Sequence, residues 1–120
     1  MVEASRQPLY RMKADFFKTL GHPARIRVLE LLSEREHAVS EMVTEIGIEP
    51  ANLSQQLSVL RRAGLVVARR DGLSVTYELT SPRVAELLAT ARAILTSVIA
   101  GQAETLEARP LPDLVNATKG

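Results

Sequence analysis

The chain contains no cysteine and no tryptophan among its 120 residues, and its only aromatic side chains are two tyrosines and two phenylalanines. The absence of cysteine excludes disulfide bonds, thiolate metal sites and a cysteine nucleophile. So few aromatic residues also disfavour a stacking platform for single-stranded nucleic acid. The remaining composition, 46% hydrophobic and 24% charged, is typical of one ordinary soluble domain.

Signals for export and for membrane insertion are also lacking. The N-terminal residues include no apolar signal core, and no apolar run approaches the length expected of a membrane span. The sequence therefore predicts a cytoplasmic protein with no membrane partner.

Catalytic motifs are not found either. The chain has no glycine-rich phosphate loop and no HExxH motif, and its serine, histidine and carboxylate residues show no catalytic spacing. We therefore expect no enzymatic activity and no cofactor.

Charge is segregated along the chain, although the formal net charge is only +1. Positions 30–49 carry six glutamates and one arginine, whereas positions 51–70 carry four arginines and no acidic residue. A one-sided basic cluster is the electrostatic signature expected of a surface that binds nucleic acid.

Apolar spacing predicts four helices, then a hairpin, then a long last helix. Proline at the first turn and glycine at the exit support several of the helix boundaries. Ser40 is a good N-cap for the third helix. The predicted helices cover residues 8–20, 23–33, 40–46, 50–64 and 82–107.

The helix predicted over residues 50–64 carries the strongest functional signal. Leu53, Leu57 and Leu60 share one face, so the opposite face, which is polar and lacks acids, points outward. Amide and hydroxyl groups followed by arginines can reach base edges and phosphates in a DNA groove. A solvated amphipathic helix would show the same pattern. A short helix and a turn containing Gly47 precede it, however, and this arrangement favours a helix-turn-helix.

A β-hairpin is predicted over residues 65–79, because Asp71-Gly72 lies between two runs rich in β-forming residues. Arg69 and Arg70 are expected at its tip, where they would contact phosphates beside the groove. Two solvated arginines are the alternative, and the preceding helix-turn-helix favours the DNA-binding interpretation.

The first and last predicted helices carry more apolar surface than one small domain needs. A two-fold dimer would bury both helices, and packing against the same chain is the alternative. The expected dimer residues are Leu9, Met12, Phe16, Leu87, Ala91, Ile94, Leu95 and Val98. We expect residues 1–7 to be flexible, residues 8–108 to form one DNA-binding and dimerisation domain, and residues 109–120 to be a disordered tail.

Three stretches, residues 20–32, 53–66 and 69–77, together resemble the ArsR/SmtB family of winged helix-turn-helix repressors. With the flanking helices, the resemblance covers nearly everything from Pro8 to Ile99. It implies a mainly α fold with a β-hairpin wing, in the order α-α-α-α-β-β-α. It also implies a homodimer, joined through the first and last helices, that binds an imperfect inverted repeat in double-stranded DNA and represses transcription.

The resemblance assigns residues 51–62 to a recognition helix and residues 69–74 to the wing. Asn52, Ser54 and Gln55 are expected to read bases, and the arginines to hold phosphates or a guanine. The full set of expected DNA contacts is Asn52, Ser54, Gln55, Ser58, Arg61, Arg62, Arg69 and Arg70.

The family's metal sensors use ligands that this chain lacks. Their thiolate motif falls on residues 38–41, which include no cysteine. Their second site falls on Ser81, Arg83, Ile94 and Ser97, so both standard sites are missing. His22, His37 and Glu41 remain as weak candidates for a nickel or zinc site. A capping role for His22 and a solvated acidic loop around His37 explain the same residues more simply.

A different class of function stays open. The acidic surface between Glu30 and Glu49, or the tail, would dock a partner protein on which DNA binding depends. The inducer would be a small molecule, a partner protein or a non-standard metal, or there would be none. The sequence does not distinguish repression from activation.

Overall fold

The computed structural model of the chain describes residues 7–108, with side chains described up to residue 103. The flexible ends expected at 1–7 and 109–120 lie, apart from residue 7, outside the described residues, and the predicted bounds of one domain over 8–108 stay a prediction. The elements in chain order are α1 (Leu9–Leu20), α2 (Pro23–Glu34), β1 (His37–Ala38), α3 (Val39–Ile46), α4 (Pro50–Arg62), β2 (Val66–Asp71), β3 (Ser74–Leu79) and α5 (Pro82–Ala108).

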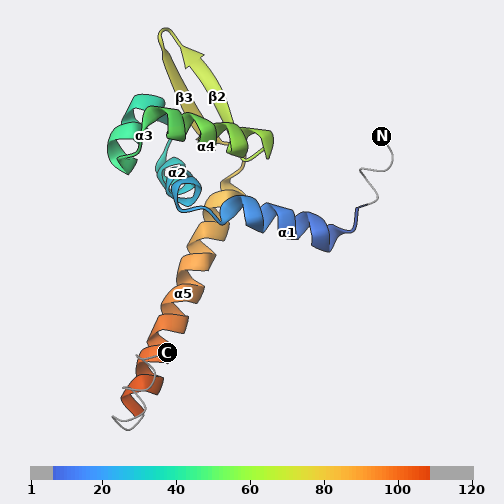
Figure 1. Ribbon diagram of the computed structural model, residues 1–120, viewed down its shortest axis with the longest axis vertical. Helices are drawn as coiled ribbons and strands as arrows, with labels where there is room; N and C mark the ends of the chain where they lie inside the picture. The colour runs from blue at the N-terminus through green and yellow to red at the C-terminus, as the bar shows by residue number, and fades with distance from the viewer. Residues whose placement is uncertain (1–6, 109–120) are drawn as a thin grey trace. The chain divides into compact units, whose positions relative to one another are not determined.

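The chain divides into two compact units, Met1–Ala85 and Glu86–Gly120. In the first unit, α2 packs against α3 and α4, and the β2–β3 hairpin extends beyond α4 (Figure 1). The α1 helix contributes only Leu20 to the buried residues, at its C-terminal end. The buried apolar core consists of Leu20, Val28, Leu29, Leu31, Leu32, Met42, Leu53, Leu57, Leu60, Leu65, Val66 and Val84.

A three-stranded antiparallel sheet in the order β1-β3-β2 completes this unit. The two-residue strand β1 pairs His37 with Tyr77 and Ala38 with Thr76. The sequence predicts no strand here, because two residues are too few to show the alternation of a strand. The predicted order of helices and hairpin is otherwise confirmed, with β1 as an addition.

The start of α3 differs from the prediction. Ala38, not Ser40, is the N-cap residue, and alanine has no side-chain acceptor. The carboxylate of Glu41 reaches back instead, and its Oε1 accepts the backbone N–H of Ala38 at 2.8 Å. A carboxylate in the first turn also interacts favourably with the positive end of the helix dipole.

The tip of the hairpin also differs. Asp71 pairs with Ser74 at the end of the ladder, so the two turn residues are Gly72 and Leu73. Gly72 has a φ of 66°, a conformation that favours glycine at the first position of a two-residue turn. Arg69 and Arg70 therefore lie within β2 and not at the tip, and the side chain of Leu73 is fully exposed there.

The α5 helix contains one segment, Pro82–Ala103, that is long and apolar enough to cross a membrane by length and composition alone. The expectation that no run approaches the length of a span is wrong on this measure. A stretch of this segment rich in alanine and aliphatic residues, in which Glu86 and Arg92 are the charged residues, reaches a mean hydropathy of 1.5. One such helix is weak evidence for a membrane span, because helices that pack against protein have the same composition.

Candidate nucleic-acid interface

The outer face of α4 is a continuous polar surface without an acidic side chain. Leu53, Leu57 and Leu60 anchor the inner face and are at most 2% exposed. Gly47, with a φ of 75°, ends α3 and allows the chain to turn directly into α4. The predicted contact residues of this helix all lie exposed on its outer side: Asn52, Ser54, Gln55, Ser58, Arg61 and Arg62.

Three arginines, two of them on α4 and one on β2, have no compensating partner among the described residues. The side chains of Arg61, Arg62 and Arg70 make no hydrogen bond or ion pair within the part of the chain that the structure describes. All three are exposed. Free guanidinium groups of this kind are suited to phosphate oxygens and to the acceptors of guanine.

Arg69 is placed differently from Arg70. Successive residues of a strand point to opposite faces, so these two arginines lie on opposite faces of the hairpin. Arg69 forms ion pairs with Glu36 at 2.8 Å and with Glu78 at 3.4 Å. The hydrogen bond that Arg69 donates to the carboxylate of Glu36 is the main cause that raises the pKa of Arg69. Its charge is therefore compensated within the chain.

A series of hydrogen bonds joins α4 to α2 and to the end of α1. Arg25 of α2 donates from Nε to Oε1 of Gln56 at 2.8 Å, and from Nη1 to the backbone oxygen of Thr19 at 3.1 Å. Gln56 in turn donates from Nε2 to Oδ1 of Asn52 at 2.9 Å. Neither Arg25 nor Gln56 was among the site residues predicted from the sequence. The one sequence feature that could have identified Gln56 is its position as a polar residue beside Leu53 and Leu57 on the inward face of the helix.

The candidate metal ligands have other partners. His22 caps α2, and its Nδ1 accepts the N–H of Ala24 at 3.1 Å. His37 is buried, with Nδ1 3.0 Å from the backbone oxygen of Arg35. Among the residues that the structure describes, no group of three or more His, Cys, Asp or Glu could hold a metal ion.

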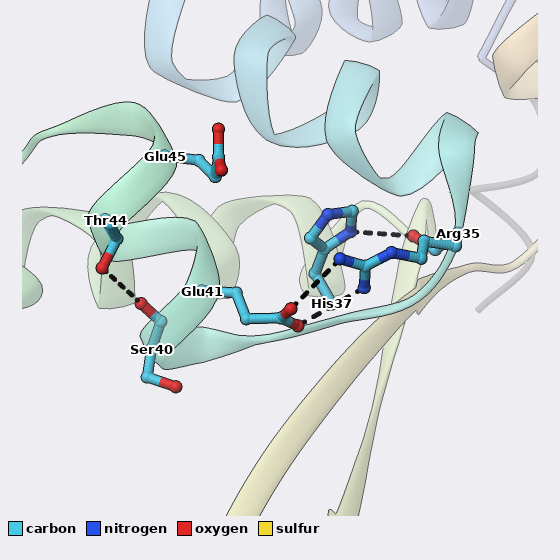
Figure 2. A pocket seen from close by; sticks show the side chains of 6 residues that line it. All are labelled: Arg35, His37, Ser40, Glu41, Thr44 and Glu45. Carbon is cyan, nitrogen blue, oxygen red and sulfur yellow. Dashed lines mark hydrogen bonds and ion pairs between the residues drawn. The ribbon is translucent and has the colours of Figure 1, made fainter.

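Figure 2 shows the pocket beside His37, where the guanidinium of Arg35 points at the carboxylate of Glu41. Their N–O distances are 3.1 and 3.4 Å. The hydrogen bond from Arg35 and that from the N–H of Ala38 lower the pKa of Glu41. This carboxylate therefore serves an ion pair and a helix cap, and His37 points to a backbone carbonyl.

Of the eight apolar residues expected at a dimer interface, six are exposed and two are half-buried. On α1, Leu9 is 64% exposed and Met12 is 50% exposed, whereas Phe16 is half-buried and packs edge-on against Phe17 with ring centroids 5.4 Å apart. On α5, considered by itself, Ala91, Ile94, Leu95 and Val98 are exposed and Leu87 is half-buried. Three further apolar side chains on these two helices are exposed and were not among the expected dimer residues, those of Tyr10, Phe17 and Ile99.

A family match, a relative in sequence and a solved structure all indicate similarity to bacterial transcriptional regulators. Residues 22–67 match the family described as bacterial regulatory protein, arsR family. An HTH-type transcriptional regulator of Mycobacterium tuberculosis, Rv0081, is 56% identical over 102 residues, which cover 84% of this chain and 90% of the relative. The crystal structure of Rv0081 superposes with a TM-score of 0.76 over 81% of this chain and 98% of that chain.

Two further relatives are a repressor and a homodimeric DNA-binding domain. A biofilm growth-associated repressor from Xylella fastidiosa is 43% identical over 75 residues, covering 62% of this chain and 66% of the relative. A homodimeric winged helix-turn-helix DNA-binding domain from Mycobacterium bovis, solved by NMR, is 31% identical. It superposes with a TM-score of 0.69 over 76% of this chain and 84% of that chain.

Proposed function

This chain belongs to the arsR family of bacterial regulatory proteins, and from this premise we propose that it represses transcription as a homodimer bound to an inverted-repeat operator. It is a winged helix-turn-helix transcriptional regulator and not an enzyme, as the family and the relatives agree. The observation that carries the proposal is the acid-free outer face of α4, together with Arg61, Arg62 and Arg70, whose guanidinium groups have no partner among the described residues.

We infer that the first two turns of α4 read base edges. Gln55 is exposed and makes no side-chain hydrogen bond within the described residues, so its amide can pair with an adenine through both its donor and its acceptor. Ser54 and Ser58 are suited to single contacts from the same face. Arg61, Arg62 and Arg70 would hold phosphates, which fix the register of the helix in the groove.

The homodimer in this proposal uses the apolar side chains of α1 and α5. A two-fold dimer presents two recognition helices to two half-sites, which explains why an inverted repeat is expected. The homodimeric state of the Mycobacterium bovis relative supports this assignment. The dimer also accounts for the apolar composition of α5, so we favour a protein interface over a membrane span for that helix and expect the regulator to act in the cytoplasm.

Repression is favoured over activation by the relative from Xylella fastidiosa, which is itself a repressor. The described residues offer no observation that favours a metal-responsive site. An inducer that is a small molecule or a partner protein remains compatible with the proposal.

The test is selection of bound duplexes from a randomised pool with the full-length protein, followed by affinity measurements at fixed salt. The proposal predicts an enriched inverted repeat bound at least about a thousandfold more tightly than random DNA. Enrichment should be the same with a chelator and with added nickel or zinc. Equal affinity for all duplexes would contradict sequence-specific regulation, and enrichment only in the presence of a second protein would support the partner-dependent alternative.

A further inference from the structure

We propose that Gln56 and Arg25, which lie behind the DNA-facing surface, determine the chemical group that Asn52 presents to DNA. This inference rests on the proposed function of α4 as the recognition helix. It makes Gln56 a positioning residue that acts through Asn52 and does not itself touch a base.

The three side chains form a directed hydrogen-bond chain. Arg25 Nε donates to Gln56 Oε1 at 2.8 Å, and Gln56 Nε2 donates to Asn52 Oδ1 at 2.9 Å. Gln56 is only 6% exposed, whereas Asn52 lies at the exposed start of α4. The chain therefore runs from a half-buried cation through a buried amide to a surface amide.

The direction of this chain follows from the chemistry of its first member. A guanidinium has N–H donors and no acceptor, so the Gln56 atom facing Arg25 must be the carbonyl oxygen. The NH₂ group of Gln56 is then the end that faces Asn52, and Asn52 must accept its hydrogen bond through its own carbonyl oxygen. The orientations of both amides are thus determined by Arg25, although each amide alone is nearly symmetric in shape.

Asn52 is consequently presented to DNA as a donor. Its Oδ1 is turned back to Gln56, and its Nδ2 is the end left to point outward. In the major groove an amide NH₂ pairs with acceptors such as guanine O6 and N7 or thymine O4. Bidentate reading of adenine would require Oδ1, which already accepts from Gln56, to point outward and accept a second hydrogen bond from the adenine amino group. Gln55 has no such partner among the described residues and keeps both options.

The hydrogen bonds that link Arg25, Gln56 and Asn52 should persist in the DNA complex, because breaking them costs free energy. A buried amide that loses its partner pays the full desolvation cost of the unpaired group. Binding energy from a single base contact is of the same order, so the contact that preserves the chain is favoured. The backbone oxygen of Thr19, at the end of α1, holds the other side of Arg25 at 3.1 Å.

The decisive variant is Gln56→Glu, which keeps the shape and reverses the polarity. A carboxylate at position 56 still accepts from Arg25, but it offers only acceptors to Asn52. Asn52 must then donate Nδ2 inward and present Oδ1 outward. At the base pairs that Asn52 contacts, we expect preference to move from acceptor-bearing bases toward the amino groups of cytosine or adenine, with about a tenfold or larger change in relative affinity.

Asn52→Asp provides the reference result, because an aspartate there can present only acceptors while leaving Gln56 unchanged. Gln55→Glu is the matched control, since it makes the same chemical change at the neighbouring exposed position. The experiment compares the base preferences of wild type and the three variants on the same randomised pool. The proposal predicts that Gln56→Glu and Asn52→Asp shift preference at the same base positions, and that Gln55→Glu leaves those positions unchanged.

The outcomes separate this inference from the proposed function. If Asn52→Asp changes the base preference of the wild type and Gln56→Glu does not, the inference is overturned while the proposed function stands. No wild-type preference for any duplex overturns both. If Gln56→Glu fails to fold by thermal unfolding, Gln56→Met replaces it. Loss of preference at the Asn52 positions alone then supports the inference, and an unchanged profile overturns it.

Discussion

The guanidinium of Arg69 lies 2.8 Å from the carboxylate of Glu36, an ion pair that ties strand β2 to the residue before β1. Glu78 on the neighbouring strand holds the same guanidinium at 3.4 Å. Arg70, one residue along the strand, points to the opposite face and has no such partner among the described residues. The two adjacent arginines of the wing therefore have different roles, which the sequence alone did not separate.

Arg70→Ala should weaken binding to all duplexes alike, because a phosphate contact carries no sequence information. The slope of log affinity against log salt should become shallower by about one, the change expected for one lost phosphate contact. Arg69→Ala should leave this slope nearly unchanged. The measurement is fluorescence anisotropy over a series of salt concentrations, and an equal change for both variants would show that Arg69 leaves Glu36 to bind DNA.

Gln55→Ala should lower affinity for the selected duplex by about 1–3 kcal/mol, the usual value of a good base contact. Affinity for random DNA should change little, so the specificity ratio falls. Gln102→Ala, the same substitution at an exposed position of α5, is the control and should change neither affinity. Equal losses on selected and random DNA would mean that Gln55 does not read a base.

Met12→Glu should convert the proposed dimer to a monomer, because it places a charge in an apolar interface. Sedimentation velocity measures the change, and affinity for an inverted repeat should fall with it. Ala14→Glu adds the same charge to an exposed residue of α1 outside the apolar stripe and should leave the dimer intact. A Met12→Glu protein that remains a dimer would remove α1 from the interface.

Acid should weaken the start of α3 through Glu41. Arg35 and the N–H of Ala38 hold the pKa of Glu41 below its ordinary value of 4.5, so the charged form is stabilised in the folded state. That stability is present above pH 4.5 and is lost as the pH falls through the lower, folded value.

Glu41→Gln should therefore be less stable than wild type at pH 7, and the difference should shrink as the pH falls below 4.5 and through the lower folded-state pKa of Glu41. Urea unfolding at several pH values measures both proteins. Glu45→Gln is the control, because its carboxylate makes no hydrogen bond or ion pair with the described side chains. A pH-independent difference between wild type and Glu41→Gln would contradict the role given to Arg35.

Strong periodic signals in the sequence were sufficient to predict most of the fold. The spacing of Leu53, Leu57 and Leu60 defines the buried face of α4, and the exposed face opposite them could therefore be predicted. Gly47 and Pro50 marked the turn and the helix start in the same way. These features are local, and local spacing is what a single sequence shows best.

The errors arose where long-range partners decide the outcome. β1 exists because Tyr77 and Thr76 of a distant strand pair with it. The role of Arg69 depends on Glu36, 33 positions away, and the orientation of Gln56 depends on Arg25, 31 positions away. The observed hairpin turn lies one residue later than the predicted one, because Gly72 occupies the first turn position and not the second.

The central claim, that the outer face of α4 reads DNA, is tested most directly by NMR titration of the ¹⁵N-labelled protein with the selected duplex. The account predicts that the largest shifts occur in the side-chain NH₂ signals of Asn52 and Gln55, and in the backbone amides of α4 and β2. Shifts confined to the acidic surface of residues 30–49, with the Asn52 and Gln55 signals unmoved, would contradict it.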